Sequence, residues 1–461
     1  MRGNLSDGRT SVTPTVQGTG LRSAGASGDE RTVVGGMALA DPMGGTVAAG
    51  ATVTSCNSCG GRDLREVLSL GSTPIANALV DPAHAPAVDL SYPLSIVFCP
   101  DCALVQLGYH LPAEQIFDAE YPYYSSVSDA LCAHAAAHVD RLVRERHLGP
   151  TSLVVEVASN DGYLLRNVVT AGVRALGIDP SPGQAEAAEA VGVTTIVGFF
   201  GAEQAEATRD AYGPADVIVA NNVMAHVPDL DDFAKGLATL LADDGVVTVE
   251  NPYLRDLVEH VQFDTIYHEH FSYFSCSSVE ALMARHGLYL NDIDYFPDLH
   301  GGTMRWYLGH RLERTVQCQQ QLDAERSIGM TGIDYYARFA EQVRTCQDQL
   351  GVLLDDLAGN GRRVAAYGAA AKGATLLNSI GIGVDRIEYV VDLSIHKQGK
   401  LMPGCRLPIR PVEALVNDRP DDVLLLAWNF ADEIVAQQGP YLAGGGTFYV
   451  PVPRPRRLGA D

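Results

Sequence analysis

The most constraining feature of this sequence is a set of two closely spaced cysteine pairs. Cys56 and Cys59 form one CxxC pair, and Cys99 and Cys102 form another. Each pair lets two thiolates converge on one tetrahedral ion, so the two pairs together fill the four positions of a zinc site. Because no coordination position is left open, we expect a structural zinc ion and not a catalytic one. Neither pair opens a thioredoxin-like βαβ pattern, which argues against a redox dithiol.

The composition limits the compartment and the partners of the protein. The chain has nine cysteines, and those outside the two pairs are scattered, which indicates a reducing compartment and not a disulfide framework. A formal net charge of −23 argues against binding to bare nucleic acid or to an anionic membrane. No apolar run has transmembrane length, and the N-terminus lacks the apolar core of a signal peptide. We therefore expect a cytoplasmic protein.

The length of 461 residues predicts roughly three domains. Residues 1–50 are rich in Gly, Ser, Thr and Ala with few large apolar residues, so we expect this extension to be disordered. The remaining pattern predicts an α/β protein, with a small N-terminal zinc-binding module followed by two Rossmann-like domains. The predicted boundaries are 51–125 for the zinc-binding module, 126–309 for the first α/β domain, 310–360 for a helical linker and 361–461 for the C-terminal α/β domain.

The first α/β domain opens with a strand, a turn and a helix. Residues 153–158 are apolar, a turn containing Gly162 follows, and residues 163–171 have a helical pattern. The turn has one glycine where a dinucleotide fingerprint needs three, so by itself it is a weak signal. A second strand ends in Asp179, where a carboxylate can hold the ribose hydroxyls of an adenosyl group.

Two further buried strands, 217–222 and 244–250, also end in polar residues, and these strand ends meet at one edge of a parallel sheet. Ordinary loop polarity is the alternative reading of such residues. The candidate cofactor-binding residues at this edge are Glu156, Ser159, Asn160, Asp161, Gly162, Asp179, Asn221 and Asn222.

The segment 263–275, FDTIYHEHFSYFS, places ionisable side chains within an aromatic run. Tyr267, His268, Glu269 and His270 supply a phenol, two imidazoles and a carboxylate, which are the groups that proton transfer uses. A satisfied polar cluster under a loop is one alternative. A metal site at the two histidines is another, although no further ligand follows at suitable spacing.

Other polar segments are candidates for ligand contact. The segment 121–126 is dense in tyrosine and serine, and a packed loop is its alternative interpretation. His226 follows the third strand, where it is either a capping or a catalytic residue. The turn that begins at His300 includes two glycines and is followed by Arg305, so a ligand can approach it closely.

The C-terminal domain repeats the strand, turn and helix arrangement. Residues 363–367 form an apolar strand, and Gly368 to Gly373 open the next helix. Small residues at such a turn let backbone N–H groups meet a phosphate, and Lys372 adds a positive charge. A tight structural turn is the alternative. A basic loop at 396–404 follows the next strand.

The chain resembles a known family in five motifs that occur in the same order. The paired CxxC knuckles, YPYYSSVSDA, VEVASNDGYLL, NNVMAHVPDL and TIYHEHFSYFS are similar to those of bacterial sugar C-methyltransferases that act on nucleotide-linked keto-deoxysugars. The resemblance runs from about Cys56 to Pro451. It implies a zinc module, a domain that binds S-adenosylmethionine (SAM), and a C-terminal α/β domain that binds the nucleotide sugar. It also implies methylation at C3 of a dTDP-4-keto-deoxysugar, in deoxysugar biosynthesis for a natural product such as an antibiotic.

The resemblance also assigns roles to individual residues. His270 is the candidate base, assisted by Tyr267 and Glu269, while Tyr121 and His226 line the sugar pocket. The basic loop is expected near the nucleotide diphosphate. The candidate substrate-binding residues are Tyr123, Tyr124, His300, Arg305, Ala371, Lys372, His396, Lys397 and Lys400.

The residue types suit this reaction. A C–H beside a ketone becomes removable when a donor such as a tyrosine hydroxyl stabilises the enolate oxygen, and no metal is required. The alternatives are methylation at C5 or at oxygen or nitrogen, an NAD-dependent oxidoreductase, and a zinc and nucleotide-binding module without chemistry. The sequence leaves open whether His270 or Tyr267 takes the proton, and whether the substrate carries an amino group. It also leaves the oligomeric state open, and a monomer is compatible with it.

Overall fold

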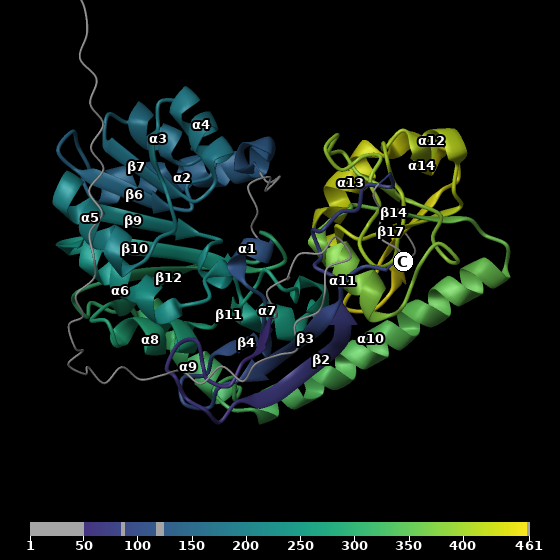
Figure 1. Ribbon diagram of the computed structural model, residues 1–461, viewed down its shortest axis with the longest axis horizontal. Coiled ribbons are helices and arrows are strands. Elements are labelled where there is room, and N and C mark those ends of the chain that lie inside the picture. The colour runs from purple at the N-terminus through teal and green to yellow at the C-terminus, as the bar shows by residue number, and fades with distance from the viewer. Residues whose placement is uncertain (1–49, 84–87, 117–123, 459–461) are drawn as a thin grey trace, which may run out of the picture. The chain divides into compact units, whose positions relative to one another are not determined.

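A computed structural model describes residues 50–83, 88–116 and 124–458 (Figure 1). The expectations for the extension at 1–50, except Gly50, and for Tyr121 and Tyr123 lie outside the described residues. No helix in the described part of the chain is long and apolar enough to cross a membrane.

The zinc-binding module is a small antiparallel sheet that includes one strand from a distant segment. Its sheet has the order β11–β4–β3–β2, and β1 pairs separately with β5. In β3 alternate residues are buried, as expected of a sheet with one covered face. The bounds are β1 (Ala51–Thr52), β2 (Arg65–Thr73), β3 (Tyr92–Phe98), β4 (Val105–Leu107), β5 (Tyr109–His110), α1 (Ala113–Ile116) and β11 (Ser272–Tyr273).

A seven-stranded sheet forms the second domain, with the order β12–β13–β10–β9–β6–β7–β8. The five strands from β6 to β10 are parallel, and four of them were predicted from the sequence; β8 and the antiparallel edge formed by β12 and β13 were missed. The strands are β6 (Leu153–Val157), β7 (Arg174–Asp179), β8 (Thr194–Val197), β9 (Ala215–Asn221), β10 (Leu241–Pro252), β12 (Tyr289–Phe296) and β13 (Thr303–Gly309).

Helices cover both faces of this sheet. Successive residues of its central strand point to opposite faces, and both sets are buried. In β6, Val155 packs into one apolar cluster and Val154 into another. Ser128 caps α2 by accepting from the backbone N–H of Leu131. The helices are η1 (Ser125–Val127), α2 (Asp129–Glu145), α3 (Leu165–Thr170), α4 (Pro182–Ala190), α5 (Ala202–Tyr212), η2 (Met224–His226), α6 (Leu230–Leu240), α7 (Leu254–Glu259), η3 (Phe263–Thr265) and α8 (Cys276–Ala284).

The predicted helical connection is two helices, α9 (Val316–Ser327) and α10 (Asp334–Gly359). The chain leaves α9 at Gly329, whose φ of +85° favours glycine. Along α10 the apolar residues recur every three or four positions and are buried, so this helix has a core face and is not a mostly solvated connector. It is the long green helix in Figure 1. Its buried residues are Tyr336, Phe339, Val343, Cys346, Leu350, Leu354 and Leu357.

The C-terminal domain is a six-stranded sheet with the order β16–β15–β14–β17–β18–β19, parallel except for β19. After β14 the chain turns at Gly368, where a Cβ atom would lie 2.7 Å from that of Ala427. The strand that precedes the basic loop is short and includes only β15. The elements are β14 (Val364–Tyr367), α11 (Ala371–Ser379), β15 (Val390–Val391), β16 (Ile409–Arg410), α12 (Ala414–Asp418), β17 (Asp422–Leu425), η4 (Trp428–Phe430), α13 (Ala431–Gln437), α14 (Gly439–Ala443), β18 (Thr447–Val450) and β19 (Arg456–Arg457).

One apolar cluster joins the zinc module, α7, α10 and α11. Within it, Phe98 of β3 packs against Tyr336 of α10 with ring centroids 5.3 Å apart. The zinc module and the C-terminal domain therefore share a core that α10 completes.

We predict that Leu350→Ala lowers the free energy of unfolding by about 2–5 kcal/mol, because Leu350 is fully buried in this cluster and its removal leaves a cavity. Val352, two positions along the same helix, is 60% exposed, and Val352→Ala should change the free energy by less than about 0.5 kcal/mol. Denaturant unfolding of both variants checks this. Equal effects would show that α10 does not bury the Leu350 face.

Candidate functional site

The four predicted metal ligands converge. The Sγ atoms of Cys56, Cys59, Cys99 and Cys102 all lie within 4.8 Å of one another, and the pairs Cys56–Cys102 and Cys59–Cys99 are 3.5 Å apart. Four thiolates around zinc, with Zn–S bonds of about 2.3 Å, place their sulfurs about 3.8 Å apart. The cluster therefore fits a tetrahedral zinc ion. In the described ranges it is the one group of three or more potential ligands close enough to share an ion.

Neighbouring groups orient the first cysteine pair. The backbone N–H groups of Ser58 and Gly61 lie 3.4 Å from the Sγ atoms of Cys56 and Cys59, to which they donate. Arg285, which follows α8, donates to the Ser58 hydroxyl at 3.0 Å. The zinc knuckle is thus tied to the seven-stranded domain through α8.

A tight turn follows β6 at the carboxyl edge of the seven-stranded sheet. The Asp179 carboxylate accepts the backbone N–H groups of Asn160 and Ser181, each at 2.9 Å. Asn160 and Gly162 have φ values of +50° and +74°, so the chain reverses sharply here. Burial raises the pKa of Asp179, which these two hydrogen bonds oppose. The predicted cofactor-binding residues of β6 and β7 therefore lie together.

Several buried polar atoms at this edge have no hydrogen-bond partner among the described residues. They are both carboxylate oxygens of Glu156, Ser159 Oγ, Asp161 Oδ1 and Asn221 Oδ1. Burial raises the pKa of Glu156 well above its usual value, and the charges of Asp179 and Asp161 raise it further. Most of these atoms are acceptors, whereas the ammonium, ribose hydroxyls and adenine amine of SAM are donors. The residues present fit that ligand, because unpaired buried polar atoms are costly.

The segment 263–275 is held by the zinc module. Ser272 and Tyr273 form β11, which pairs with β4, and the Leu107 N–H donates to the Phe271 carbonyl at 2.9 Å. His268 is buried, and its Nε2 lies 3.2 Å from the Pro93 carbonyl of β3. Among the described residues, His268 and His270 do not belong to a group of side chains close enough to share a metal ion.

Glu269 is held by a residue that the sequence analysis missed. Asn77, which lies between the two cysteine pairs, donates its side-chain amide to both carboxylate oxygens at 2.7 and 2.8 Å. Burial raises the pKa of Glu269 to about 7, and the Asn77 amide opposes that rise. Nothing in the sequence singles out Asn77, because it is a lone amide in an irregular segment.

His270 has a defined tautomer. Its Nδ1 lies 3.0 Å from the Thr265 carbonyl, which can only accept, so Nδ1 carries the hydrogen. The Nε2 lone pair then accepts from the Tyr267 hydroxyl at 2.8 Å. Burial lowers the pKa of His270 well below its usual value, and the neighbouring His226 lowers it further. The ring is therefore a neutral imidazole with its basic nitrogen directed to Tyr267.

His226 joins this cluster from the end of β9. Its Nδ1 donates to the Glu269 carbonyl at 2.8 Å, and its ring centroid is 4.9 Å from that of His270. Burial lowers the pKa of His226. The structure thus brings His226 to the Tyr267, Glu269 and His270 cluster, from which it is separated in the sequence.

The C-terminal domain contributes a second set of residues. The Trp428 indole N–H donates to Asp264 Oδ2 at 2.6 Å, and the ammonium of Lys372 lies 4.6 Å from the centroid of the Trp428 ring. Burial raises the pKa of Asp264 to about 6, and the charge of Lys372 opposes that rise. Trp428 and Asp264 were not predicted as site residues.

The residues after β12 have other neighbours. Arg305 is buried and forms an ion pair with Glu250 at 2.5 Å, while its Nη2 lies 2.8 Å from His134 Nε2. Its guanidinium is therefore engaged with the neighbouring strand β10. His300 has a φ of +54°, and burial lowers the pKa of its imidazole to about 4.

The remaining predicted substrate residues are spread over three segments. Tyr124 is exposed and precedes η1, and Ala371 begins α11. Lys397 donates to the Ala369 carbonyl at 2.9 Å, while His396 and Lys400 are exposed on the same loop.

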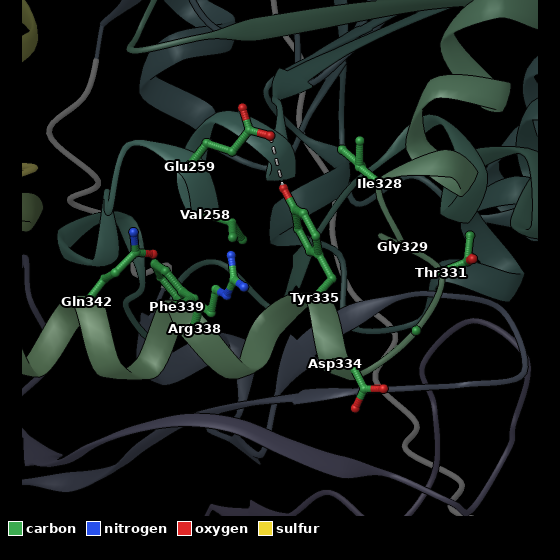
Figure 2. A pocket seen from close by; sticks show the side chains of 11 residues that line it. Val258, Glu259, Ile328, Gly329, Thr331, Asp334, Tyr335, Arg338, Phe339 and Gln342 are labelled. Carbon is green, nitrogen blue, oxygen red and sulfur yellow. Dashed lines mark hydrogen bonds between the residues drawn. The ribbon is translucent and has the colours of Figure 1, made fainter.

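A cavity of about 750 Å³ lies at a different place, against α7 and the start of α10 (Figure 2). Both Tyr335 and Glu259 line it, and the Tyr335 hydroxyl donates to the Glu259 carboxylate at 3.4 Å. None of the predicted site residues lines this cavity.

Known proteins place the chain in a family. The C-methyltransferase NovU of Streptomyces niveus is 36% identical over 414 residues, which cover 89% of this chain and 98% of NovU. The chain belongs to this C-methyltransferase family. Family models match as well, with a "putative zinc binding domain" at 56–117, a "methyltransferase domain" at 133–292 and a "C-methyltransferase C-terminal domain" at 298–453.

Other similarities are more limited. An uncharacterized methyltransferase of Mycobacterium avium is 38% identical over 103 residues, 22% of this chain and 40% of that protein. Magnesium protoporphyrin IX methyltransferase from Synechocystis PCC 6803 with bound SAM aligns with 38% of this chain and 78% of that chain, at 14% identity and a TM-score of 0.30. A similarity at that TM-score has no bearing on the activity. The C-methyltransferase is therefore a SAM-dependent enzyme with a zinc-binding domain, on the strength of its family.

We predict that the purified C-methyltransferase contains one zinc ion per chain and that Cys99→Ala abolishes it, because three thiolates no longer close the tetrahedral site. The melting temperature should fall with the loss of zinc, since metal binding stabilises the folded state. Elemental analysis and thermal unfolding check this. Cys132→Ala, at a half-buried cysteine outside the cluster, should keep the metal. Full zinc content in Cys99→Ala would contradict the four-cysteine site.

We predict that Glu269→Gln stabilises the protein above pH 7. The folded-state pKa of Glu269 is raised from 4.5 to about 7, so folding is progressively penalised as pH rises between these values. At 1.36 kcal/mol per pKa unit, the variant should gain about 3 kcal/mol relative to wild type above pH 7 and none below pH 4. Denaturant unfolding at several pH values measures this, with the exposed Glu341→Gln as control. A difference that does not vary with pH would refute the assignment.

Proposed function

We propose that the enzyme methylates C3 of a dTDP-4-keto-deoxysugar, in deoxysugar biosynthesis for a natural product, with His270 as the general base. The observation that carries this is the His270 geometry, in which a backbone carbonyl fixes the tautomer and leaves Nε2 as the basic atom. The family supports carbon as the methyl acceptor. A carbon beside a ketone is acidic enough for an imidazole to deprotonate it when the enolate is stabilised.

His270 is a better proton acceptor than Tyr267 in this arrangement. The Tyr267 hydroxyl donates to Nε2, so the phenol is protonated when the imidazole is neutral. A phenol would first have to lose that proton before it could act as a base. In our proposal Tyr267 therefore orients the imidazole and shifts its hydroxyl to the substrate when the sugar binds.

Glu269 and His226 position the base. The Glu269 carbonyl accepts from His226, and the Glu269 carboxylate is held by Asn77. These contacts hold Glu269, the residue before His270, by its backbone and its side chain, so we propose that the imidazole keeps its direction during proton transfer. Phe263 and Phe271 are fully buried beside it and exclude water.

Bound SAM supplies an electrophilic methyl group. We propose that the carboxyl edge of the seven-stranded sheet holds it, with Asp179 on the ribose hydroxyls and Glu156 among the buried acceptors. The other residues proposed to hold it are Ser159, Asn160, Asp161, Gly162, Asn221 and Asn222. Of these, Ser159, Asp161 and Asn221 have buried side-chain atoms without a hydrogen-bond partner among the described residues.

The nucleotide is proposed to lie against the C-terminal domain. His396, Lys397 and Lys400 put positive or titratable groups on one loop of a chain whose net charge is −23. Such a local basic group is what a diphosphate requires. Tyr121, Tyr123 and Tyr124 are proposed to contact the sugar, and of these the structure describes Tyr124.

We predict that His270→Asn lowers the rate of methyl transfer by about 10²–10⁴-fold, because a positioned general base contributes that much. Its affinity for SAM should stay within about twofold, since His270 is not on the sheet edge. Mass spectrometry of products from a panel of dTDP-4-keto-deoxysugars, run in deuterated water, measures transfer, and calorimetry measures affinity.

His260→Asn is the matched control, because the His260 side chain is 58% exposed. It should transfer methyl groups at the wild-type rate. An unchanged rate in His270→Asn would refute the base assignment. A methyl group found on C5, oxygen or nitrogen of the wild-type product would refute the proposed position.

A further inference from the structure

The ammonium group of Lys372 lies in an unusual place for a surface lysine. It sits 4.6 Å from the centroid of the Trp428 ring, which is the geometry of a cation–π contact. Lys372 is the second residue of α11, directly after the turn that follows β14. Burial lowers the pKa of its ammonium, and the negative charge of Asp264 opposes that shift. The charge is therefore partly removed from water.

Trp428 connects this lysine to the segment that carries the base. Its indole N–H donates to Asp264 Oδ2 at 2.6 Å. Its ring also packs against Gly301, where a Cβ atom would lie 2.9 Å from the indole edge. Thr265 follows Asp264 in the chain, and its carbonyl holds His270 Nδ1 at 3.0 Å. Lys372 is thus joined to the base by a short series of contacts.

The charge of Lys372 is felt at the base itself. Burial is the main cause of the low pKa of His270, and the positive charge of Lys372 contributes to it. The same charge lowers the pKa of His300 and of Asp264, each after the larger effect of burial. These electrostatic effects agree with the packing of α11, which carries Lys372, against η3, which carries Asp264 and Thr265.

The turn before Lys372 is poorly suited to a phosphate. The Ala369 N–H, one of the backbone donors that a phosphate would use there, donates instead to the Asp392 carboxylate at 2.7 Å. That carboxylate also forms an ion pair with Lys397 at 3.8 Å, so the Ala369 N–H is already engaged and is not available to a phosphate. The ammonium of Lys372 instead lies over Trp428, on the side of Asp264.

We propose that Lys372 donates a hydrogen bond to the enolate oxygen of the substrate, and that Trp428 and Asp264 position its ammonium beside His270. This rests on the proposed function. When Nε2 of His270 takes the proton from the carbon beside the ketone, the C–H electron pair forms a C=C bond and the carbonyl π pair moves to oxygen. The ammonium stabilises that oxyanion and keeps its own proton. When the carbon gains its methyl group, the C=C pair forms the new C–C bond, the C–S pair leaves with the sulfur of the methyl donor, and a lone pair of the oxyanion forms the C=O bond again.

A fixed cation at a developing oxyanion is worth a large factor in rate. Removing one such donor typically costs about 10²–10³-fold, and the effect is larger where water is excluded. A lysine that held the diphosphate would behave differently, because its loss would weaken binding of the nucleotide itself and leave the proton-transfer step intact at saturating substrate.

The test is exchange of the proton beside the ketone of a dTDP-4-keto-deoxysugar in deuterated water, without the methyl donor, followed by NMR at saturating sugar. Lys372→Gln should lose exchange by about 10²-fold or more. Its affinity for dTDP, measured by calorimetry, should stay within about twofold. The exposed Lys235→Gln is the control and should match wild type in both measurements.

Asp264→Asn separates positioning from folding. Removing this negative charge lowers the pKa of Lys372, so the alkaline limb of the exchange rate should shift to lower pH while thermal unfolding stays near that of wild type. An unshifted limb would overturn the positioning role.

Unchanged exchange in Lys372→Gln would overturn the proposal, and so would a loss of dTDP affinity of more than about tenfold with exchange intact. Wild-type enzyme that exchanges no proton on any sugar of the panel would instead overturn the proposed function on which this inference rests. The wild-type measurement therefore tests the proposed function. The comparison of the Lys372 variant with an active wild type tests the role of Lys372.

Discussion

The pairing of β11 with β4 is the contact on which the candidate active site depends. It joins the segment that carries His270 to the sheet of the zinc module, so the turn that we propose as catalytic is continuous with a second sheet. Asn77 and Pro93 of the same module hold Glu269 and His268. A turn with three buried ionisable side chains would otherwise have to satisfy them in a loop, at a cost of several kcal/mol each. A zinc ion at the four cysteines would stabilise the sheet that carries these partners, because metal binding stabilises the folded state.

Burial sets the electrostatics of the cluster. The imidazoles of His226 and His270 are desolvated, which lowers the pKa of each and keeps both neutral, while burial raises the pKa of Glu269 to about 7. A neutral imidazole is the form that can accept a proton. A positive charge nearby lowers the basicity of the imidazole. It also makes the C–H of the substrate more acidic, because it stabilises the negative charge that develops in the transition state. Lys372 reaches this region from a different domain, which couples the position of the C-terminal domain to the reactivity of the turn.

Sequence reasoning was accurate where function follows from local spacing. The four cysteines converge as their CxxC spacing predicts, and the parallel strands end with Asp179 and Asn221 at one edge. It was less accurate where tertiary packing determines which residues are buried and which partners they contact. The polar connection at 317–357 is two helices, one of which buries a full apolar face, and Arg305 is engaged by Glu250 on the neighbouring strand. Asn77 and Trp428 could not be found, because their partners Glu269 and Asp264 lie 192 and 164 residues away.

The amino-acid sequence by itself determined the zinc ligands, the parallel-sheet architecture and the identity of the YHEH turn, since each depends on residues within one or two elements. Only the tertiary structure decided how that turn works. The tautomer of His270 follows from the Thr265 carbonyl, the pKa of Glu269 from its burial against Asn77, and the placement of Lys372 from the face of Trp428. Proton affinity and charge stabilisation depend on desolvation and on distances of a few ångströms. Those quantities arise only when segments far apart in the chain pack together.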